Sequence, residues 1–430
     1  MGNARALALE ALIKVEKQKA YSHLVLNQLL SRHPQLDLRD RQLLTELVYG
    51  TIQHQRLLDF YLEPFLKQGI AKLEGWVKQL LRLSVYQLYF LNRIPSHAVV
   101  NEAVKLAKKR GHRGIQGLVN GVLRNMLRQP KRSLDTIVEP VERIAIETSH
   151  PTWLVARWVR QYGLDTARVI CRANNERPAM TIRVNLLKAS KQDVLSRLTA
   201  SGYRVSETSE AEQGLKVENP AKLMDSPLFK EGYFTIQSES SMLVAPLLSP
   251  QPGMKVLDLC AAPGGKTTHL AELMANQGRI VANDVHKHKL RLIETAARRL
   301  GITIIEVTAR DGTAVSPEEW GTFDCILVDA PCSGFGVIKH KPDLKWNKRL
   351  EDIEQIKELQ LHLLSNAAKL LKSGGQLVYS TCTIDKEENE GVIERFLEYH
   401  PHFELAGDMR QILPQDFGSD GFFMVKLSKA

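Results

Sequence analysis

Two cysteines occupy positions at which a thiol could take part in a reaction. Cys332 lies in a polar turn, residues 329–334, and Cys382 lies in a second polar turn, residues 379–383. Each turn follows an apolar run typical of a buried strand. A lone cysteine is usually a small buried hydrophobic residue, but a thiolate is conceivable on a polar turn at the end of a strand. We therefore treat these two thiols as candidates for chemistry.

If a methyl donor binds next to such a thiol, the thiol can serve one specific reaction. The C5 carbon of a pyrimidine is a poor nucleophile, and addition of a thiolate to C6 makes C5 nucleophilic enough to take a methyl group. A base must then remove the C5 proton, and the thiolate must leave. A carboxyl group such as Asp329, near N3 or the amino group, would help by stabilising the added ring.

A glycine-rich loop, residues 260–267, follows the apolar run 256–259 and could hold a ligand. A phosphate-binding loop of the Gly-x-x-x-x-Gly-Lys-Thr type would need a glycine where Cys260 stands, and the dinucleotide pattern Gly-x-Gly-x-x-Gly is absent. A nucleoside cofactor without phosphates, such as S-adenosylmethionine, needs only close approach to the backbone and to a helix N-terminus.

Four successive predicted strands are each followed by a residue that could face a ligand: Cys260, Asp284, Asp311 and Asp329. The carboxyl ends of parallel strands meet at one edge of a sheet, so these side chains are expected in one crevice. There Asp284 could accept from both ribose hydroxyls, and Asp311 could reach an adenine edge. Taken alone, each aspartate is more typical of a helix cap or a turn than of a ligand site. The repetition over four strands favours the nucleoside cofactor.

The elements that must position these residues follow a strand–turn–helix rhythm from residue 250 onward. Apolar strands that alternate with helices predict an α/β fold with a mostly parallel, doubly wound sheet. The strands are expected at 256–259, 280–283, 304–307, 323–328, 376–380 and 422–427, and the helices at 267–274, 286–300, 350–371 and 388–399.

The preceding sequence divides into two further parts. Residues 1–130 show helical periodicity with no useful strand pattern, and Asp40 is expected to cap a helix there. A polar stretch after Pro130 suggests a boundary, and a small α+β unit is expected beyond it. We therefore predict an all-helical domain at 1–135, an α+β module at 136–236 and the doubly wound domain at 237–430.

The net charge of +10, from 58 Lys and Arg against 48 Asp and Glu, is unevenly distributed. The whole excess falls in the first 130 residues, which suggests that this part binds a polyanion such as nucleic acid. A solvated helix face is the alternative explanation for its densest run of basic side chains. That run comprises Lys105, Lys108, Lys109, Arg110, His112 and Arg113, with Arg124 and Arg128 beyond it.

Composition excludes several classes of protein. No apolar stretch is long enough to span a membrane. The five cysteines include no Cys-x-x-Cys pair and are too scattered for a disulfide framework, so neither a thiolate zinc site nor any other metal is expected. Cys171 and Cys325 are expected to be ordinary buried residues. Reduced thiols suggest a cytoplasmic protein.

Residues 255–430 resemble the RNA cytosine-C5 methyltransferases of the Sun/Fmu (RsmB) group, whose domain has a Rossmann-like class I methyltransferase fold. The matching stretches are 258–267, 329–334, 341–346, and 380–383 followed by 387–390. Lys339 and His340 stand where this family usually has two arginines. The DNA cytosine methyltransferases take their nucleophile from the Pro-Cys motif, whose cysteine here is Cys332.

The resemblance implies a role for each candidate residue. Cys382 would be the nucleophile, and Cys332 would assist release of the methylated product. The S-adenosylmethionine site would be lined by Cys260, Ala261, Ala262, Pro263, Gly264, Gly265, Lys266, Asp284, Asp311 and Asp329.

The front of the chain resembles the RNA-binding, all-helical antitermination factor NusB at residues 94–95, 101–109 and 119–123. The middle segment is similar to the small module, related to an RNA-recognition fold, that precedes the catalytic core in the Sun/Fmu family. The resemblance implies 16S ribosomal RNA as substrate, naked or in an assembling subunit, and we expect a monomer without membrane association. The RNA-binding candidates are Lys105, Lys108, Lys109, Arg110 and Arg113.

Two other function classes remain open at this level. A nucleotide hydrolase would bind ATP tightly and show no affinity for S-adenosylmethionine. A non-catalytic RNA-binding assembly factor would have no use for both Cys332 and Cys382, so the presence of the pair favours an enzyme.

Overall fold

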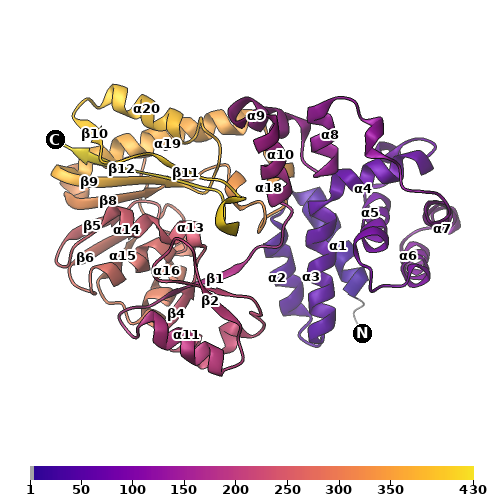
Figure 1. Ribbon diagram of the computed structural model, residues 1–430, viewed down its shortest axis with the longest axis horizontal. Coiled ribbons are helices and arrows are strands. Elements are labelled where there is room, and N and C mark those ends of the chain that lie inside the picture. The colour runs from indigo at the N-terminus through magenta and orange to yellow at the C-terminus, as the bar shows by residue number, and fades with distance from the viewer. Residues whose placement is uncertain (1–3) are drawn as a thin grey trace. The chain divides into compact units, whose positions relative to one another are not determined.

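The computed structural model describes residues 4–430, which form two compact units (Figure 1). The first, called the helical unit here, contains the described residues up to Asn175 together with the segment His340–Asn347. The second, called the sheet unit, contains Glu176–Lys339 and Lys348–Ala430. The proposed domain boundaries at residues 135 and 236 stay predictions.

The helical unit contains no strand among residues 4–175, and over residues 4–130 this agrees with the predicted helical periodicity. Its elements are α1 (Ala4–Gln18), α2 (Ser22–Arg32), α3 (Leu38–Gln53), α4 (Gln55–Leu62), η1 (Glu63–Phe65), η2 (Ile70–Lys72), α5 (Gly75–Phe90), α6 (Ser96–Arg110), α7 (Arg113–Arg128), η3 (Leu134–Thr136), α8 (Pro140–Glu147), α9 (Thr152–Tyr162) and α10 (Leu164–Ala173). The expected cap at Asp40 is wrong. Asp37 caps α3 by accepting from the Asp40 amide at 2.7 Å, because the helix begins one turn earlier than its apolar stripe.

A short segment far along the chain completes the helical unit. It carries α18 (Leu344–Asn347), and its Trp346 indole donates to the carbonyl of Ile52 at 2.9 Å. The buried Lys345 amine donates to the carbonyl of Gln53 at 2.9 Å. This interleaving is invisible in the helical periodicity, because the segment joins the unit through single side chains rather than through a long apolar stripe.

The sheet unit begins with a small α+β module, as expected. It contains β1 (Met180–Val184), α11 (Lys191–Ala200), β2 (Val205–Glu207), β3 (Gly214–Val217), η4 (Leu223–Asp225), α12 (Pro227–Lys230) and β4 (Phe234–Ile236). The strands form an antiparallel sheet in the order β2-β3-β1-β4. Apolar side chains from this sheet and from α11 form its core.

The larger sheet follows the predicted strands closely. Its elements are α13 (Glu239–Met242), α14 (Val244–Leu248), β5 (Lys255–Asp258), α15 (Gly265–Leu273), β6 (Arg279–Asn283), α16 (Lys287–Leu300), β7 (Ile305–Thr308), α17 (Pro317–Trp320), β8 (Phe323–Asp329), η5 (Phe335–Val337), α19 (Leu350–Leu370), β9 (Leu371–Thr381), α20 (Glu390–Tyr399), β10 (Phe403–Leu405), β11 (Arg410–Ile412), η6 (Asp416–Gly418) and β12 (Phe422–Lys429). The strand order is β10-β12-β9-β8-β5-β6-β7, and β11 pairs with β12.

Helices cover both faces of this sheet (Figure 1). Alternate strand residues face opposite layers: Leu257 packs in the core with α19 and α20, whereas Val256 packs in the core with α14, α15 and α16. The five strands β9, β8, β5, β6 and β7 pair in parallel, and β12 runs antiparallel to β9. The predicted mostly parallel, doubly wound sheet is therefore confirmed, while the short strands β10 and β11 carried no sequence signal. None of the described helices is both long and apolar enough to cross a membrane.

Candidate functional site

The parallel strands bring the predicted site residues to one edge of the large sheet. Cys260 follows β5, Asp284 follows β6, Asp329 ends β8 and Cys382 follows β9. Because β9, β8, β5 and β6 are consecutive neighbours, their carboxyl ends are adjacent. The expectation of a shared crevice thus rests on an observed strand order.

The two candidate thiols are in contact. The Sγ atoms of Cys332 and Cys382 lie 3.3 Å apart, and both side chains are partly exposed. The hydrogen bond with Cys382, together with burial, raises the pKa of Cys332 well above its ordinary value. The contact lets one sulfur of the pair donate its proton to the other.

A buried carboxyl group, Glu388, joins the two cysteine loops. Its Oε2 accepts from the Ser333 amide at 2.8 Å, and its Oε1 lies 3.5 Å from the Thr383 hydroxyl, which donates to it. The Ser333 and Thr383 hydroxyls also bond each other at 2.7 Å. Since these residues directly follow Cys332 and Cys382, Glu388 holds both thiols in register.

Burial raises the pKa of Glu388 to about 7. The Gln360 amide adds a third donor at 3.1 Å and also bonds the carbonyl of Pro331 at 2.9 Å. Glu388 was only part of a matching stretch in the sequence, and its position five residues after Thr383 gave no sign of this positioning role.

A close backbone approach further fixes the Cys382 loop. The Gly336 amide donates to the carbonyl of Cys382 at 3.0 Å, and the Gly421 amide donates to the carbonyl of Gly336 at 2.9 Å. A Cβ built on Gly336 would lie 1.8 Å from the Gly421 carbonyl oxygen. Only glycine fits at residue 336, so the two loops can approach each other this closely.

Asp329 sits beside the thiols in a network of donors. Its Oδ2 pairs with the Lys266 amine at 2.7 Å, and its Oδ1 accepts from the Ser380 hydroxyl at 2.8 Å. The Lys266 amine also lies 4.9 Å from the centre of the Phe422 ring. A lysine of a phosphate-binding loop would have to leave Asp329 to reach a phosphate, so this geometry disfavours the nucleotide hydrolase.

The glycine-rich loop is anchored by Asp258 at the end of β5. Its Oδ2 accepts from the Thr267 hydroxyl at 2.6 Å, while its Oδ1 is buried without a hydrogen-bond partner among the described residues. Burial raises the pKa of Asp258 to about 7. Asp258 lay inside a predicted strand, and its role was not foreseen.

Asp284 and Asp311 act as turn residues as well as candidate ligands. The two oxygens of Asp284 accept from the amides of Ala262, at 3.3 Å, and His286, at 2.9 Å, so this carboxylate ties the loop after β5 to the loop after β6. Asp311 is exposed and accepts from the Thr313 amide at 2.9 Å and hydroxyl at 2.7 Å. These bonds from Thr313 lower the pKa of Asp311.

Cys260 lies at the same edge but is unsuited to nucleophilic chemistry. Burial, followed by the negative charges of Asp258, Asp329 and Asp284, raises the pKa of its thiol. Asn283 nearby links the strand ends, donating to the carbonyl of Leu259 at 3.1 Å. Sequence reasoning missed Asn283 because an asparagine at a strand end is common in turns.

An arginine from the small module holds the glycine-rich loop through hydrogen bonds. The buried Arg183 of β1 donates to the carbonyl of Gly265 at 2.7 Å and forms an ion pair with Glu272 of α15 at 2.7 Å. It also bonds the Thr268 hydroxyl at 3.0 Å. The alternation of residues 181–185 predicted the strand and gave no hint that one of its side chains supports the cofactor loop.

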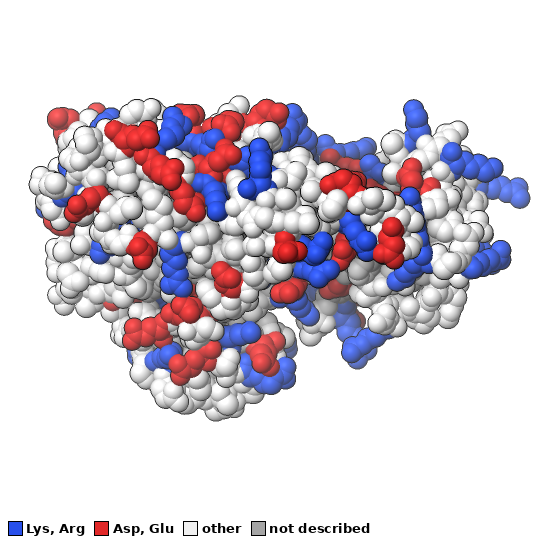
Figure 2. Space-filling view, turned by 45° about the horizontal axis from the view of Figure 1, so that its top comes forward, with Lys and Arg blue, Asp and Glu red and all other residues white. Residues whose placement is uncertain are grey.

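The basic candidates of the helical unit lie on α6 and at the start of α7. Lys105, Lys108, Lys109, Arg110 and Arg113 are all exposed. Figure 2 shows Lys and Arg side chains projecting from this end of the unit with few acidic side chains beside them. Lys105 pairs with Glu102 at 2.8 Å. The exposure is compatible both with RNA binding and with a solvated face.

Three other positions that the sequence singled out have buried side chains. Cys171 and Cys325 are buried, as expected. Lys339 is also buried, and its amine donates to the carbonyls of Pro414 at 2.6 Å and Ser419 at 3.2 Å. Lys339 thus holds the loop before β12 and is not available as an exposed cation.

Three family models match this sequence in succession. They are described as NusB family over residues 2–128, as the ferredoxin-like domain of RsmF/B-like methyltransferases over residues 150–224, and as 16S rRNA methyltransferase RsmB/F over residues 245–428. The predicted combination of a NusB-like domain, a small α+β module and a methyltransferase domain is confirmed.

Individual proteins are similar over much longer stretches. The probable ribosomal RNA small subunit methyltransferase B of Bacillus subtilis is 46% identical over 444 residues and covers 99% of each chain. The crystal structure of PH0851 has a TM-score of 0.84 and 30% identity, covering 100% of this chain and 99% of that one. The crystal structure of NSun6 from Pyrococcus horikoshii with SFG has a TM-score of 0.59 and 25% identity, covering 65% of this chain and 98% of that one.

Proposed function

The chain belongs to the 16S rRNA methyltransferase RsmB/F family, and from this premise we propose that it transfers a methyl group from S-adenosylmethionine to C5 of a cytosine in small-subunit ribosomal RNA. The substrate class follows the family and the name of the Bacillus subtilis relative. The position on the base follows from the thiol pair, because C5 of cytosine needs a nucleophile at C6 before it can accept a methyl group.

The observation that carries this proposal is the 3.3 Å contact between Cys332 and Cys382. Two thiols on neighbouring strand ends allow one sulfur to attack while the other holds a proton. Both thiols are partly exposed, although Cys382 also packs against the core of the sheet unit. A methyltransferase acting on oxygen or on an exocyclic amine would have no use for such a pair.

The residues present fit S-adenosylmethionine. Asp284 would hold the ribose hydroxyls, and loop residues 260–266 would permit close approach of the nucleoside. The unpartnered Oδ1 of Asp258 could accept from an ammonium group, and the acidic side chains at this edge suit a positively charged ligand. NSun6 from Pyrococcus horikoshii was crystallised with SFG, an analogue of S-adenosylmethionine.

When bound, S-adenosylmethionine supplies an electrophilic methyl group. The Cys382 thiolate, supported by the Cys332 S–H, adds to C6 and moves the electron pair of the C5–C6 double bond to C5. That pair would form the new carbon–carbon bond as the bond between the methyl carbon and the donor's sulfur breaks, so that S-adenosylhomocysteine leaves. Loss of the C5 proton to a base then restores the double bond and expels the Cys382 sulfur, with Cys332 assisting release. Asp329, oriented by Lys266 and Ser380, would stabilise the added ring through N3 or the amino group.

The target base must leave its stack, because C5 and C6 are attacked from the face of the ring. The exposed cations of α6 and the start of α7 would supply sequence-independent affinity for the phosphate backbone.

The nucleophile is tested with Cys382→Ser. Transfer of labelled methyl groups to small-subunit RNA should fall by about 1,000-fold or more, because the hydroxyl is a far weaker nucleophile. Binding of S-adenosylmethionine, measured by calorimetry, should stay within about twofold. Near-normal turnover would refute the assignment.

The release role is tested with Cys332→Ala. This variant should accumulate RNA attached through Cys382, seen as a slowly migrating band on a denaturing gel. The double variant Cys332→Ala/Cys382→Ser is the control and should give no band. Absence of the band in the single variant would assign release to another group.

A further inference from the structure

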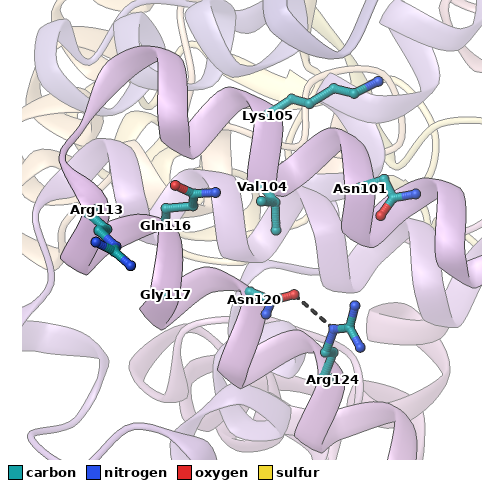
Figure 3. A pocket seen from close by; sticks show the side chains of 8 residues that line it. All are labelled: Asn101, Val104, Lys105, Arg113, Gln116, Gly117, Asn120 and Arg124. Atoms are coloured by element: carbon teal, nitrogen blue, oxygen red, sulfur yellow. Dashed lines mark hydrogen bonds between the residues drawn. The ribbon is translucent and has the colours of Figure 1, made fainter.

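Helices α6 and α7 of the helical unit border a hollow that is open to solvent and that the reaction at the thiols does not use. Its volume is about 530 Å³, within the range of small-molecule pockets. Figure 3 shows Val104 of α6 in the middle of this space, with Gln116 and Asn120 of α7 beside it. The hollow lies between two helices in tight contact, so its walls are preformed.

Three cations surround the hollow: Lys105, Arg113 and Arg124. All are exposed, and the described residues that line the space include no carboxylate, although Lys105 pairs with Glu102 at 2.8 Å. The next turn of α6 adds Lys108 and Lys109, which lie outside the hollow. This charge suits an anionic ligand, and it disfavours an apolar or basic one.

Three carboxamides give the hollow a second kind of chemistry: Asn101, Gln116 and Asn120. Asn120 Oδ1 accepts from the Arg124 guanidinium at 2.9 Å, which fixes the orientation of that amide (Figure 3). Carboxamides offer a donor and an acceptor side by side, which is the pattern that pairs with the edge of a nucleobase. Phosphate binding alone would need only the cations.

One residue that lines the hollow, Gly117, is an exposed glycine in the middle of α7. A Cβ built on Gly117 would meet no described atom within 4 Å, so packing does not require glycine there. Glycine is nevertheless among the least favourable residues inside a helix. Its absent side chain leaves the backbone of α7 open to close approach by a flat group. Gly121 has the same open surroundings but does not line the hollow, so it serves as a control.

We propose that this hollow binds one unpaired nucleotide of the RNA substrate, with the base against Gly117 and the carboxamides and its phosphate on the cations. The inference rests on the proposed function, because it takes the substrate to be RNA. Sequence-specific recognition of RNA uses unstacked, single-stranded bases, whose edges are free to form hydrogen bonds. The hollow would thus recognise a nucleotide other than the cytosine that is methylated.

The test compares the full chain with Gly117→Leu and with Gly121→Leu. Both changes replace a helical glycine with a good helix former, so neither should lower the melting temperature. The probe is a fluorescent single-stranded oligoribonucleotide carrying the methylated region, and binding is measured by anisotropy. Gly117→Leu should weaken binding by about 10-fold, the loss expected when one base contact is removed. Gly121→Leu should stay within about twofold.

The salt dependence separates base recognition from phosphate binding. Gly117→Leu removes no charge, so the slope of log Kd against log salt concentration should match that of the unchanged chain. A duplex of the same sequence should lose no affinity, since its bases are paired. Equal binding by the two leucine variants, or an equal loss for the duplex, would overturn the proposal. Sensitivity of an acidic peptide, rather than of RNA, to Gly117→Leu would also overturn it.

A second pair of variants tests the same hollow if the leucine variants fail to fold. Gln116→Glu keeps the shape and places a carboxylate in the hollow, whereas Asn125→Asp adds the same charge on α7 outside it. Only Gln116→Glu should weaken binding strongly, by about 10-fold. Methyl incorporation is scored separately: RNA binding that responds to these variants without any methyl transfer would refute the proposed function and leave the hollow intact. If methyl transfer occurs but is unchanged by these variants at low RNA concentration, the proposed function stands and the proposed role of the hollow is refuted.

Discussion

The two units of this protein use charged residues in opposite ways. In the helical unit, the cations of α6 and α7 stand in solvent with few partners. In the sheet unit, Asp258, Glu388 and the Arg183–Glu272 pair are buried and held by specific hydrogen bonds. Exposed charges act at a distance and are screened by salt. Buried charges are screened less by salt, and their net effect depends on the groups that surround them.

The two kinds of charge differ in how far residue type alone decides their effect. The exposed charges could be read from composition, because their number and placement decide their effect. The buried charges could not, because the same aspartate or glutamate has a different pKa in water and in a core. The helical unit also contains buried charges, among them Arg82, which pairs with Asp59 at 2.6 Å, and Lys345, whose pKa burial lowers to about 7.

The largest effect is expected from Arg183→Met in the sheet unit. Removing this buried cation leaves Glu272 without its partner and the Gly265 carbonyl without its donor, at a cost of about 3–5 kcal/mol. Denaturant unfolding of the full chain measures the loss. The double variant Arg183→Met/Glu272→Met should recover much of it. An equally unstable double variant would mean that packing, not charge, connects the small module to the loop helix.

A smaller effect is expected from Glu388→Gln, which keeps the shape of the buried side chain. The rate of methyl transfer should fall by about 10-fold to 100-fold, because the two cysteine loops lose a common anchor. The KM for S-adenosylmethionine should be unchanged, since Glu388 does not touch the cofactor loop. A rise in KM with unchanged kcat would place Glu388 in binding.

The same variant tests the raised pKa. In the folded protein Glu388 holds its proton up to about pH 7, whereas in the unfolded chain it loses it near pH 4.5. Stability from this group is therefore full below pH 4.5 and lost as the pH rises to about 7. The melting temperature of Glu388→Gln relative to the unchanged chain should rise over that window. A constant difference would show that the carboxyl is ionised in the fold.

A charge-removal experiment compares the units directly. Changing Lys108, Lys109 and Arg110 to Gln should flatten the salt slope of single-stranded RNA binding by about 2, since each phosphate contact contributes about 0.7. The matched control changes three exposed lysines of the sheet unit, Lys216, Lys222 and Lys230. A larger flattening in the control would mean that the phosphate contacts lie on the sheet unit and not on the helical unit.

An effect of the opposite sign is expected from Lys345→Met in the helical unit. The pKa of Lys345 is about 7 in the fold and near 10.5 in the unfolded chain, so the unfolded chain binds the extra proton between these values. Stability from this group therefore rises with pH across that window, opposite in sign to the effect of Glu388. The Met variant should lose this rise in denaturant unfolding at pH 7, 8 and 9. The exposed Lys341→Met should keep it.

Much of the sheet unit was predictable because strand periodicity and strand-end residues are local features. Runs such as 256–259 and 323–328 lie within a residue or so of β5 and β8. The adjacency of Cys332 and Cys382 followed from the assumption that consecutive parallel strands are neighbours. The strands β8 and β9 meet this assumption, whereas β8 pairs with β5 and not with β7, which precedes it in the chain. The short strands β10 and β11 were missed because three residues are too few to show an alternation.

By itself, the sequence determined the repeated strand–helix order, the residues at the strand ends and the segregation of charge, since each depends only on residue type and spacing. Only the tertiary structure decided that Glu388 and Arg183 hold the thiol loops and the glycine-rich loop, and that 340–347 completes the helical unit. Those contacts join residues far apart in the chain. Their energies arise from burial and mutual orientation, which no local pattern encodes.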